Sequence, residues 1–515
     1  MVLAVVAAAV LAGCSGPSRE AKPLPTTVRM AAAVDPWPTE GADTTSTHFL
    51  YPLNFNVYET LVKLEPDFSL SPGLAERWEP LEGNKGWRFF LRRNVKFHDG
   101  RPFTADDVLW TWERQSQARK LTSVLNTLGP GSVRKIEDFI VDFVPTRPNL
   151  SLPEQLAHPH GAILAKNTNF DSTPAAGTGP FRMVEYKAGE TVTFERYGDY
   201  WGQAPAMARM EVRFIPDLKA RVEALRSGAV DFAFDVPPES ARPLAIDERF
   251  RLVRSEPGRN QLLYINRLGR APFDLGAEPG VRRAVSLALN RSEYVRQVFA
   301  SEAETGRWMS PRSMLGASAE LVTPAPFDPD AARRTLDEAG WVPGPDGIRM
   351  RGDRPLRLTL VGWAEVSTLA FETIRDQLRA VGIDVVIRTA PDQPTFRNIY
   401  AATEFDLDLE MPSQNDGNPA FLPLSRTFSR YPNTQRFAPG GELDAKAEAA
   451  LAADTPEGVR KAAAEMMQVL INDTNIVVPL AAVPRTYAMA RTFDLAQPHP
   501  SQANQDWSTL AATRR

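Results

Sequence analysis

Two widely separated segments carry a strand, helix, strand pattern of hydrophobic and polar positions. In the first, residues 210–216 (MEVRFIP) alternate as a strand, Asp217 is placed to cap a helix, and Gly228 ends that helix before a second alternating run. Its hydrophobic positions are Val212 and Phe214, then Leu218, Val222 and Leu225 on one helix face, then Val230, Phe232 and Phe234. The segment predicts a βαβ unit.

The second segment lies about 140 residues further along the chain. Residues 356–363 (LRLTLVGW) predict a strand, a helix follows, Gly382 ends it, and residues 383–387 predict the returning strand. The helix face is predicted to consist of Ala370, Ile374, Leu378 and Val381. Parallel strands need such crossovers, and the separation of the two units favours two α/β lobes over one sheet. Ligands of open α/β sheets bind beyond the carboxyl ends of the strands, so we expect the ligand between the lobes.

A third region, residues 87–114, has a different pattern. Two extended runs are followed by an Asp-Gly turn and then by a helix, for which Thr104 and Asp107 predict a capping box. Trp87 and Trp112 belong to the hydrophobic side of these elements, so we expect them in a core. His98 and Asp99 lie on the turn, and we expect turn hydrogen bonds there in preference to catalysis.

Composition excludes several classes of protein. The 515 residues are 43% hydrophobic and 24% charged, as in ordinary globular chains. The formal net charge of −4 gives no basic excess for neutralising phosphates, so we expect no nucleic-acid partner. One cysteine and five histidines leave no Cys/His zinc cluster and no internal disulfide, and we expect no cofactor.

The single cysteine follows an apolar run at the N-terminus. Residues 2–12 have the length of a signal peptide and are too short to span a bilayer, which needs about 20 residues. Leu11, Ala12, Gly13 and Cys14 resemble the bacterial lipobox, in which the cysteine thiol receives lipid. We therefore expect a signal peptide over 1–13 and a lipidated tether over 14–27. The run lacks the usual basic start, so we expect further residues upstream of Met1.

Six successive blocks of the chain look like the signature blocks of extracellular solute-binding protein family 5, the dipeptide, oligopeptide and nickel receptors of ABC importers. In chain order they are GLAERWEP (73–80), VKFHDGRPFTADDV (95–108), GTGPFRMVEYKAGETVTFERYGDYWG (177–202), LRSGAVDF (225–232), AEPGVRRAVSLALNRSEYV (277–295) and FDPDAARRTLDEAGW (327–341). They occur in the family's order and are distributed over residues 73–341.

The resemblance implies a type II periplasmic-binding-protein fold, with two α/β lobes and an extra inserted subdomain. Residues 177–181 would mark the return from the subdomain to lobe 1, and the chain would cross between lobes near Tyr264–Asn266 and Val478–Val483. The implied domains are lobe 1 from 28–70, 170–265 and 484–515, the inserted subdomain from 71–169, and lobe 2 from 266–483.

The resemblance also implies a function and partners. The chain would be a monomeric, lipid-anchored substrate-binding protein on the periplasmic or cell-surface face of the cytoplasmic membrane. It would capture a peptide-like solute and deliver it to ABC permease and ATPase subunits, without catalysis. A metal chelate of the nickel type or a sugar oligomer remains the alternative ligand.

A serine acyl-enzyme is the competing class of protein. Ser132 to Lys135 match S-x-x-K, but no S-D-N or K-T-G motif follows. His158 and His160 are separated by Pro159 with no third ligand nearby, so a structural turn is favoured over a metal pair. No common nucleotide-binding or hydrolase motif is present in the sequence.

The ligand-binding residues are predicted partly from the resemblance. Where dipeptide receptors have a G-W-x-x-D type loop that pairs a carboxylate with the peptide amine, this chain has Gln414 or Asn415 in the carboxylate slot and Asp416 beside it. Amides suit a neutral ligand better than an ammonium ion, unless Asp416 substitutes. The predicted binding residues are Trp363, Gln414, Asn415, Asp416, Asn418, Trp308 and Arg307, with core burial an equal alternative for the two tryptophans.

Overall fold

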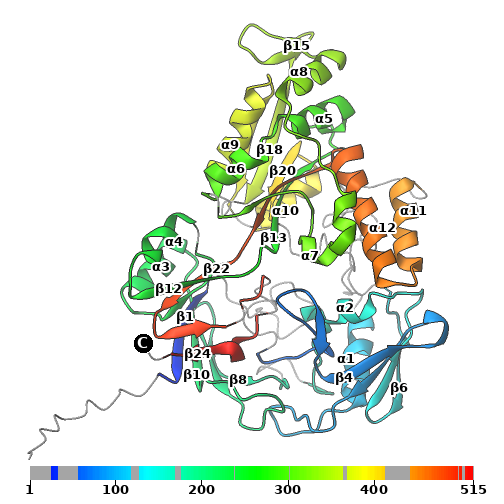
Figure 1. Ribbon diagram of the computed structural model, residues 1–515, viewed down its shortest axis with the longest axis vertical. Helices are drawn as coiled ribbons and strands as arrows, with labels where there is room; N and C mark the ends of the chain where they lie inside the picture. The colour runs from blue at the N-terminus through cyan, green and yellow to red at the C-terminus, as the bar shows by residue number, and fades with distance from the viewer. Residues whose placement is uncertain are drawn as a thin grey trace, which may run out of the picture.

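The structure is a computed structural model with three bodies, two lobes and a smaller subdomain (Figure 1). The residues it describes are 25–32, 56–117, 127–168, 176–236, 238–300, 302–363, 368–391, 393–411, 441–496, 498–500 and 505–513. The predicted signal peptide and Cys14 lie outside these residues. Within them, no helix combines the length and the apolar character that a bilayer crossing requires.

Lobe 1 is built on a seven-stranded sheet in the order β12-β22-β11-β1-β10-β9-β8. Its strands are β1 (Thr27–Ala32), β8 (Phe181–Lys187), β9 (Thr191–Arg196), β10 (Arg209–Phe214), β11 (Phe232–Ala233), β12 (Phe250–Arg254) and β22 (Thr486–Ala490). β1 pairs in parallel with both β10 and β11, so the first predicted βαβ unit is confirmed, with β1 inserted between its two strands.

Alternate residues of the lobe 1 strands face two separate cores. Ala31 and Ala233 pack with α3 (Leu218–Arg226) and α4 (Pro238–Ala245) on one face. Met30 and Phe232 pack on the other face in an aromatic cluster with Tyr487 and Trp507. This two-sided burial is the period-2 geometry of a strand covered on both faces. The Asp217 carboxylate caps α3 by accepting the Ala220 N–H at 2.7 Å, as predicted.

The inserted subdomain has a four-stranded antiparallel sheet in the order β4-β5-β7-β6. Its elements are β4 (Ala75–Pro80), β5 (Trp87–Leu91), α1 (Ala105–Gln117), β6 (Val133–Glu137), β7 (Ile140–Phe143) and α2 (Leu152–Leu156). Trp112 is buried in its core and Trp87 packs against that core. Asp107 accepts the Thr104 N–H at 2.9 Å, which confirms the capping box at the start of α1.

The joint between subdomain and lobe 1 depends on close backbone contact. A Cβ on Gly177 would lie 1.7 Å from the Val57 carbonyl oxygen, so only glycine fits there. Beside this joint the buried Glu59 carboxylate accepts hydrogen bonds from Tyr200 and Trp201 and pairs with Lys63 at 3.2 Å.

Lobe 2 has a six-stranded sheet in the order β14-β21-β13-β20-β18-β19. Its strands are β13 (Arg259–Ile265), β14 (Glu304–Thr305), β18 (Arg357–Trp363), β19 (Asp384–Ala390), β20 (Leu407–Glu410) and β21 (Val477–Val483). β18 and β19 are parallel neighbours joined by α9 (Thr368–Arg379), which confirms the second βαβ unit. Gly382 has φ +89° at the end of that crossover, where the sequence places the helix stop.

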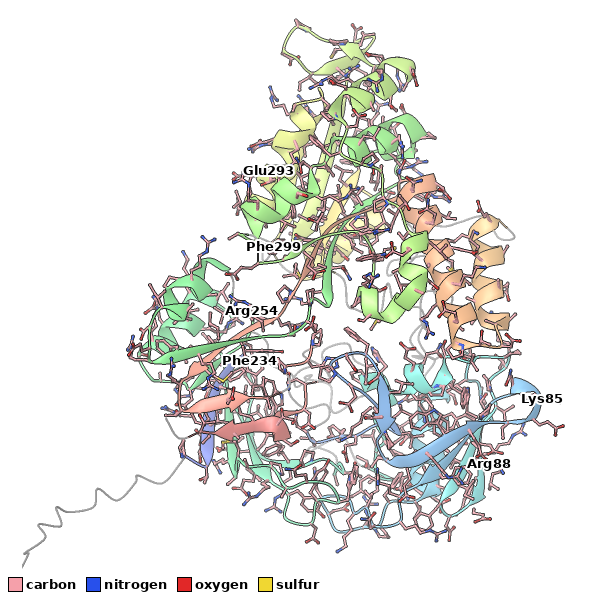
Figure 2. All side chains as sticks on the ribbon, in the orientation of Figure 1. Lys85, Arg88, Phe234, Arg254, Glu293 and Phe299 are labelled. Atoms are coloured by element: carbon pink, nitrogen blue, oxygen red, sulfur yellow. The ribbon has the colours of Figure 1, made fainter. Side chains whose placement is uncertain are left out.

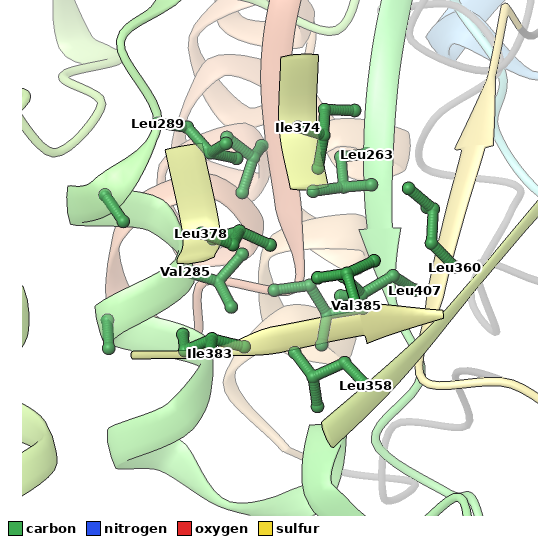
Figure 3. Packing of buried hydrophobic residues seen from close by; sticks show 14 of the residues in the cluster. Leu263, Val285, Leu289, Leu358, Leu360, Ile374, Leu378, Ile383, Val385 and Leu407 are labelled. Carbon is green, nitrogen blue, oxygen red and sulfur yellow. The ribbon is translucent and has the colours of Figure 1, made fainter. Parts of the chain in front are cut away.

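Helices cover both faces of the lobe 2 sheet. Leu263 and Leu360 point into a large core under α5 (Pro279–Ala288), α6 (Arg291–Val298), α8 (Pro329–Glu338) and α9, part of which is drawn in Figure 3. Their neighbour Leu262 faces α7 (Arg312–Leu315), α11 (Glu442–Ala452) and α12 (Pro456–Gln468), while Val361 faces α10 (Gln393–Ala402). Strands that are hydrophobic almost without interruption, such as β21 with its five successive buried residues 477–481, follow from this double coverage.

Three small sheets contain the remaining strands of the described residues. They are β2 (Val62–Leu64) with β3 (Leu70–Pro72), β15 (Val342–Pro343) with β16 (Arg349–Arg351) and β17 (Arg354–Pro355), and β23 (Phe493–Leu495) with β24 (Leu510–Ala512).

The chain passes between the two large sheets twice. The first passage lies between Arg254, the last residue of β12, and Arg259, the first residue of β13. β13 therefore joins the lobe 2 sheet several residues before the crossing expected near Tyr264–Asn266. The second passage lies between Val483 of β21 and Thr486 of β22, at the end of the expected range Val478–Val483.

Candidate functional site

The two large sheets present the carboxyl ends of their parallel strands to the same interlobe region. In lobe 2, β20 runs antiparallel to β13, which enters from the first crossing, so β20 and its parallel neighbour β18 end on the side of the crossings. In lobe 1, the Val236 N–H donates to the Thr486 carbonyl oxygen directly after the second crossing, so β11 also ends there. This is the edge at which open α/β sheets bind ligands.

A carboxylate just past the end of β11 binds both crossing segments. The Asp235 carboxylate pairs with Arg485 at 2.5 Å and with Arg259 at 3.7 Å, and Arg485 Nε also donates to the Pro500 carbonyl oxygen at 2.8 Å. Asp235 has φ +49°, a left-handed conformation that aspartate tolerates better than most residues. Lobe 1 thus fixes the start of β13 and the start of β22 through one side chain.

The electrostatics of Asp235 favour the ionised form. Burial by itself would raise the pKa of Asp235, but Arg485 and Arg259 oppose burial and hold that pKa below its ordinary value. The group therefore stays negative at neutral pH, which keeps the contacts to both crossings. The sequence blocks gave no signal for this cluster because its members lie 24 to 250 residues apart.

The lobe 2 edge contains two buried carboxylates that the sequence interpretation did not single out. Asp408 and Glu410 alternate with Leu407 and Leu409 along β20 and are buried on the sheet face opposite the large core. The alternation FDLDLE is the signal that could have identified them. The predicted binding loop, with Gln414, Asn415, Asp416 and Asn418, follows β20 along the chain and lies outside the described residues.

Trp363 is the last residue of β18, and its backbone pairs with Ala390 of β19. Its position at the carboxyl end of a parallel strand agrees with the sequence prediction, while its side chain lies outside the described part of the structure. Its role in ligand binding stays a prediction.

Trp308 and Arg307 both hold a turn of lobe 2. Trp308 Nε1 donates to the Ala319 carbonyl oxygen at 2.9 Å, and Arg307 Nε donates to the Val322 carbonyl oxygen at 3.0 Å. The Arg307 guanidinium also lies 5.1 Å from the Trp308 ring and 3.2 Å from Glu320. These contacts stabilise residues 307–322, and a ligand contact of either side chain stays a prediction.

The residues considered for catalysis make structural contacts. The Ser132 hydroxyl accepts the Gly129 N–H at 2.9 Å, and Lys135 pairs with Asp138 at 2.7 Å on the surface. His158 is buried beside the short helix at 159–161. Within the described residues, no group of three or more His, Cys, Asp and Glu side chains is placed to hold a metal ion.

His98 and Asp99 also have structural contacts, as expected. Asp99 accepts the Arg101 N–H at 3.1 Å within the turn. The His98 ring bridges to lobe 1, because Nδ1 accepts the Gly177 N–H at 3.3 Å and Nε2 donates to the Gly179 carbonyl oxygen at 3.0 Å. Burial lowers the pKa of His98 to about 4, so the ring is neutral in this bridge at physiological pH.

Comparison with known sequences identifies relatives along most of the chain. The profile for bacterial extracellular solute-binding proteins, family 5 middle region, matches residues 69–431. The nickel-binding periplasmic protein of Escherichia coli K12 is 27% identical over 64% of this chain and 65% of the relative. The di/tripeptide-binding protein 2 of Pseudomonas aeruginosa is 29% identical over 64% of this chain and 66% of the relative. The matches thus span slightly less than two thirds of these relatives' length.

Comparison with solved structures extends the likeness to the whole fold. The structure of NikA from Brucella suis in complex with Fe(III)-EDTA superposes with a TM-score of 0.81 at 22% identity, covering 95% of this chain and 100% of that one. The likeness therefore extends over nearly all of this chain, in which two α/β sheets are joined by two crossings and a subdomain lies between strands of the first lobe. The chain therefore has the type II periplasmic-binding-protein fold and belongs to family 5 of the bacterial extracellular solute-binding proteins.

Proposed function

We propose that this chain is the substrate-binding lipoprotein of an ABC importer, which captures a small solute between its lobes and delivers it to the permease. The observation that carries the proposal is the family match over residues 69–431 on a chain whose two sheets direct the carboxyl ends of their strands to one interlobe edge. Each lobe offers part of a site, so a solute that contacts both stabilises the closed arrangement by its differential affinity for that arrangement. Lipidation of Cys14 would hold the receptor at the membrane.

The solute class we favour is peptide-like, and a metal chelate is the second candidate. The di/tripeptide-binding relative supports the first class, and the nickel-binding relative and the neighbour solved with Fe(III)-EDTA support the second. Gln414 and Asn415 in the predicted loop suit a hydrogen-bonding, uncharged group, and Asp416 is the group there that can pair with an ammonium ion.

The most direct experiment is mass spectrometry of small molecules released when the purified protein is denatured. A bound peptide or chelate in stoichiometric amount supports the proposal and names the class. A chain that releases no small molecule, and also gains no thermal stability from peptide or chelate libraries, contradicts it, because a ligand at 100 times its Kd stabilises by about 2.7 kcal/mol.

Substitutions in the predicted loop test the position of the site. Asn415→Ala is expected to weaken binding of the released compound about tenfold or more, since a lost buried hydrogen bond costs about 1–3 kcal/mol. Trp363→Ala should have an effect of similar size, because the ligand loses an apolar wall. Asn94→Ala, at an exposed position of the subdomain, is the matched control and should bind normally. Wild-type affinity of both site variants in calorimetry would move the site elsewhere.

Asp416→Asn separates the two ligand classes. A loss of about tenfold or more indicates an amine-bearing peptide, because the buried ammonium ion then has no partner charge. Unchanged affinity indicates a neutral ligand or a chelate.

A further inference from the structure

Ion pairs join the lobes on two sides of the molecule. Beside the crossings, Arg254 at the end of β12 pairs with Glu302 of lobe 2 at 3.2 Å, and Figure 2 shows Arg254 close to the crossing strands. On the other side, Arg147 of the inserted subdomain pairs with Glu448 of α11 at 3.7 Å. Figure 1 shows α11 and α12 standing above α2, away from β12 and β22.

The two pairs differ in their distance from the axis of any lobe motion. Two crossing segments bound to Asp235 make a hinge, and a rotation about a hinge displaces atoms in proportion to their distance from it. The Arg254–Glu302 contact lies at the crossings, so the distance between these two side chains changes little when the lobes rotate. The Arg147–Glu448 contact lies opposite the crossings, so opening separates these two side chains more than it separates Arg254 from Glu302.

We propose that Arg147 and Glu448 form an electrostatic latch, which exists only when the lobes are closed and holds a fraction of the ligand-free protein in that arrangement. The inference rests on the proposed receptor function for its purpose, but the latch itself is a property of the ligand-free chain. The Arg147 side chain is 30% exposed and that of Glu448 is 54% exposed, so the pair breaks without leaving a buried charge.

The size of the effect follows from the exposure of the pair. Exposed ion pairs of this kind change an equilibrium by about 1.5- to 5-fold. Reversing one charge replaces attraction by repulsion, so the closed-to-open ratio should fall by about 2- to 25-fold. The Debye length falls to about 3 Å at 1 M salt, which is comparable to the separation of the pair, so 1 M salt should have a similar but smaller effect on the wild type.

The latch is tested by pulsed electron resonance distances between spin labels on either side of the contact. Labels on Lys85→Cys in the subdomain and Ala452→Cys at the end of α11 report the opening, in a Cys14→Ser background that removes the native thiol. Both positions are exposed. The two-component distance distribution of the full-length, ligand-free protein gives the closed-to-open ratio directly.

The variants are Glu448→Arg, Arg147→Glu and the double reversal. Each single reversal should deplete the closed distance, and the double reversal should restore it. Glu79→Arg is the matched control, because it makes the same charge change at an exposed ion pair within the subdomain and should leave the ratio unchanged. If a single reversal acted by damaging the fold and not by breaking the ion pair, the double reversal would not restore the closed distance.

Three results would overturn the latch. They are a ligand-free wild type without a closed component, a ratio that single reversals leave unchanged, and a double reversal that is as open as the single variants. Release of a small molecule from the denatured wild type is measured independently of the spin-label distances. If the latch tests fail but a solute is released, the proposed receptor function is unaffected. A latch in a protein that never binds a solute would contradict the receptor function alone.

Discussion

Stability near the joint of subdomain and lobe 1 should depend on pH through His98. The partly buried ring accepts the Gly177 N–H and donates to the Gly179 carbonyl oxygen, and it makes a T-shaped contact with the Tyr197 ring at a centroid distance of 4.9 Å. Loss of hydration lowers the pKa of His98 to about 4, and the nearby positive charge of Arg182 acts in the same direction.

The magnitude follows from linkage. The unfolded chain binds this proton with a pKa near 6.5, so between pH 6.5 and about 4 the unfolded state binds more protons than the folded state. The contribution of His98 is therefore complete above about pH 6.5 and is lost as the pH falls toward 4. A difference of about 2.5 pKa units corresponds to about 3 kcal/mol in full, and to about 2 kcal/mol between pH 7 and pH 5.

The assay is urea unfolding at about pH 7 and about pH 5, with tryptophan fluorescence as the probe. His98→Gln keeps a donor for the Gly179 carbonyl oxygen but cannot titrate, so it should be less stable than wild type at pH 7 and lose less stability at pH 5. The gap between the two proteins should shrink by about 2 kcal/mol. Tyr197→Phe, which loses the 2.8 Å hydrogen bond to the Phe97 carbonyl oxygen, is the control and should cost about 1 kcal/mol at both pH values.

An equal gap between wild type and His98→Gln at both pH values would refute the reasoning. It would mean that the ring titrates near its ordinary pKa and that the bridge to residues 177–179 does not exclude the proton.

Three further substitutions test contacts that position the lobes. Gly177→Ala puts a Cβ 1.7 Å from the Val57 carbonyl oxygen and should lower thermal stability severely. Gly198→Ala is the control, because its Cβ would meet open space. Equal melting temperatures of the two variants would contradict the close packing at Gly177. Asp235→Asn keeps the left-handed preference but removes the charge that binds both crossings, and should cost about 1–3 kcal/mol in urea unfolding, while no loss would argue against the hinge cluster. Glu59→Gln removes the charge of a buried carboxylate that pairs with the partly exposed Lys63 and accepts hydrogen bonds from Tyr200 and Trp201, so it should cost about 1–3 kcal/mol in urea unfolding, and an unchanged midpoint would show that this cluster is dispensable.

The local elements follow from the amino-acid sequence without reference to the fold. Residues 356–387 and 210–234 specify strand, helix and strand because their hydrophobic period changes from 2 to 3.6 and back, and glycines at 228 and 382 supply the positive φ that ends each helix. Asp217 and Asp107 act on backbone groups within a few residues, so their capping roles could be predicted without a fold. The family blocks likewise predicted the two-lobed architecture, because they are ordered stretches of contiguous residues.

Contacts between residues far apart in the chain depend on the tertiary structure. Asp235 with Arg485, and Arg147 with Glu448, are hundreds of residues apart, and charged residues are too common along the chain for spacing to select these pairs. The first crossing lies before Arg259 because β13 finds its hydrogen-bond partners in β20 and β21, which a local pattern cannot reveal. Likewise Trp308 fits either a ligand or a core contact by sequence, and its bond to the Ala319 carbonyl oxygen exists only once residues 307–322 fold back on themselves. Local chemistry specifies elements, whereas pairing and burial across the chain depend on the free energy of the whole fold.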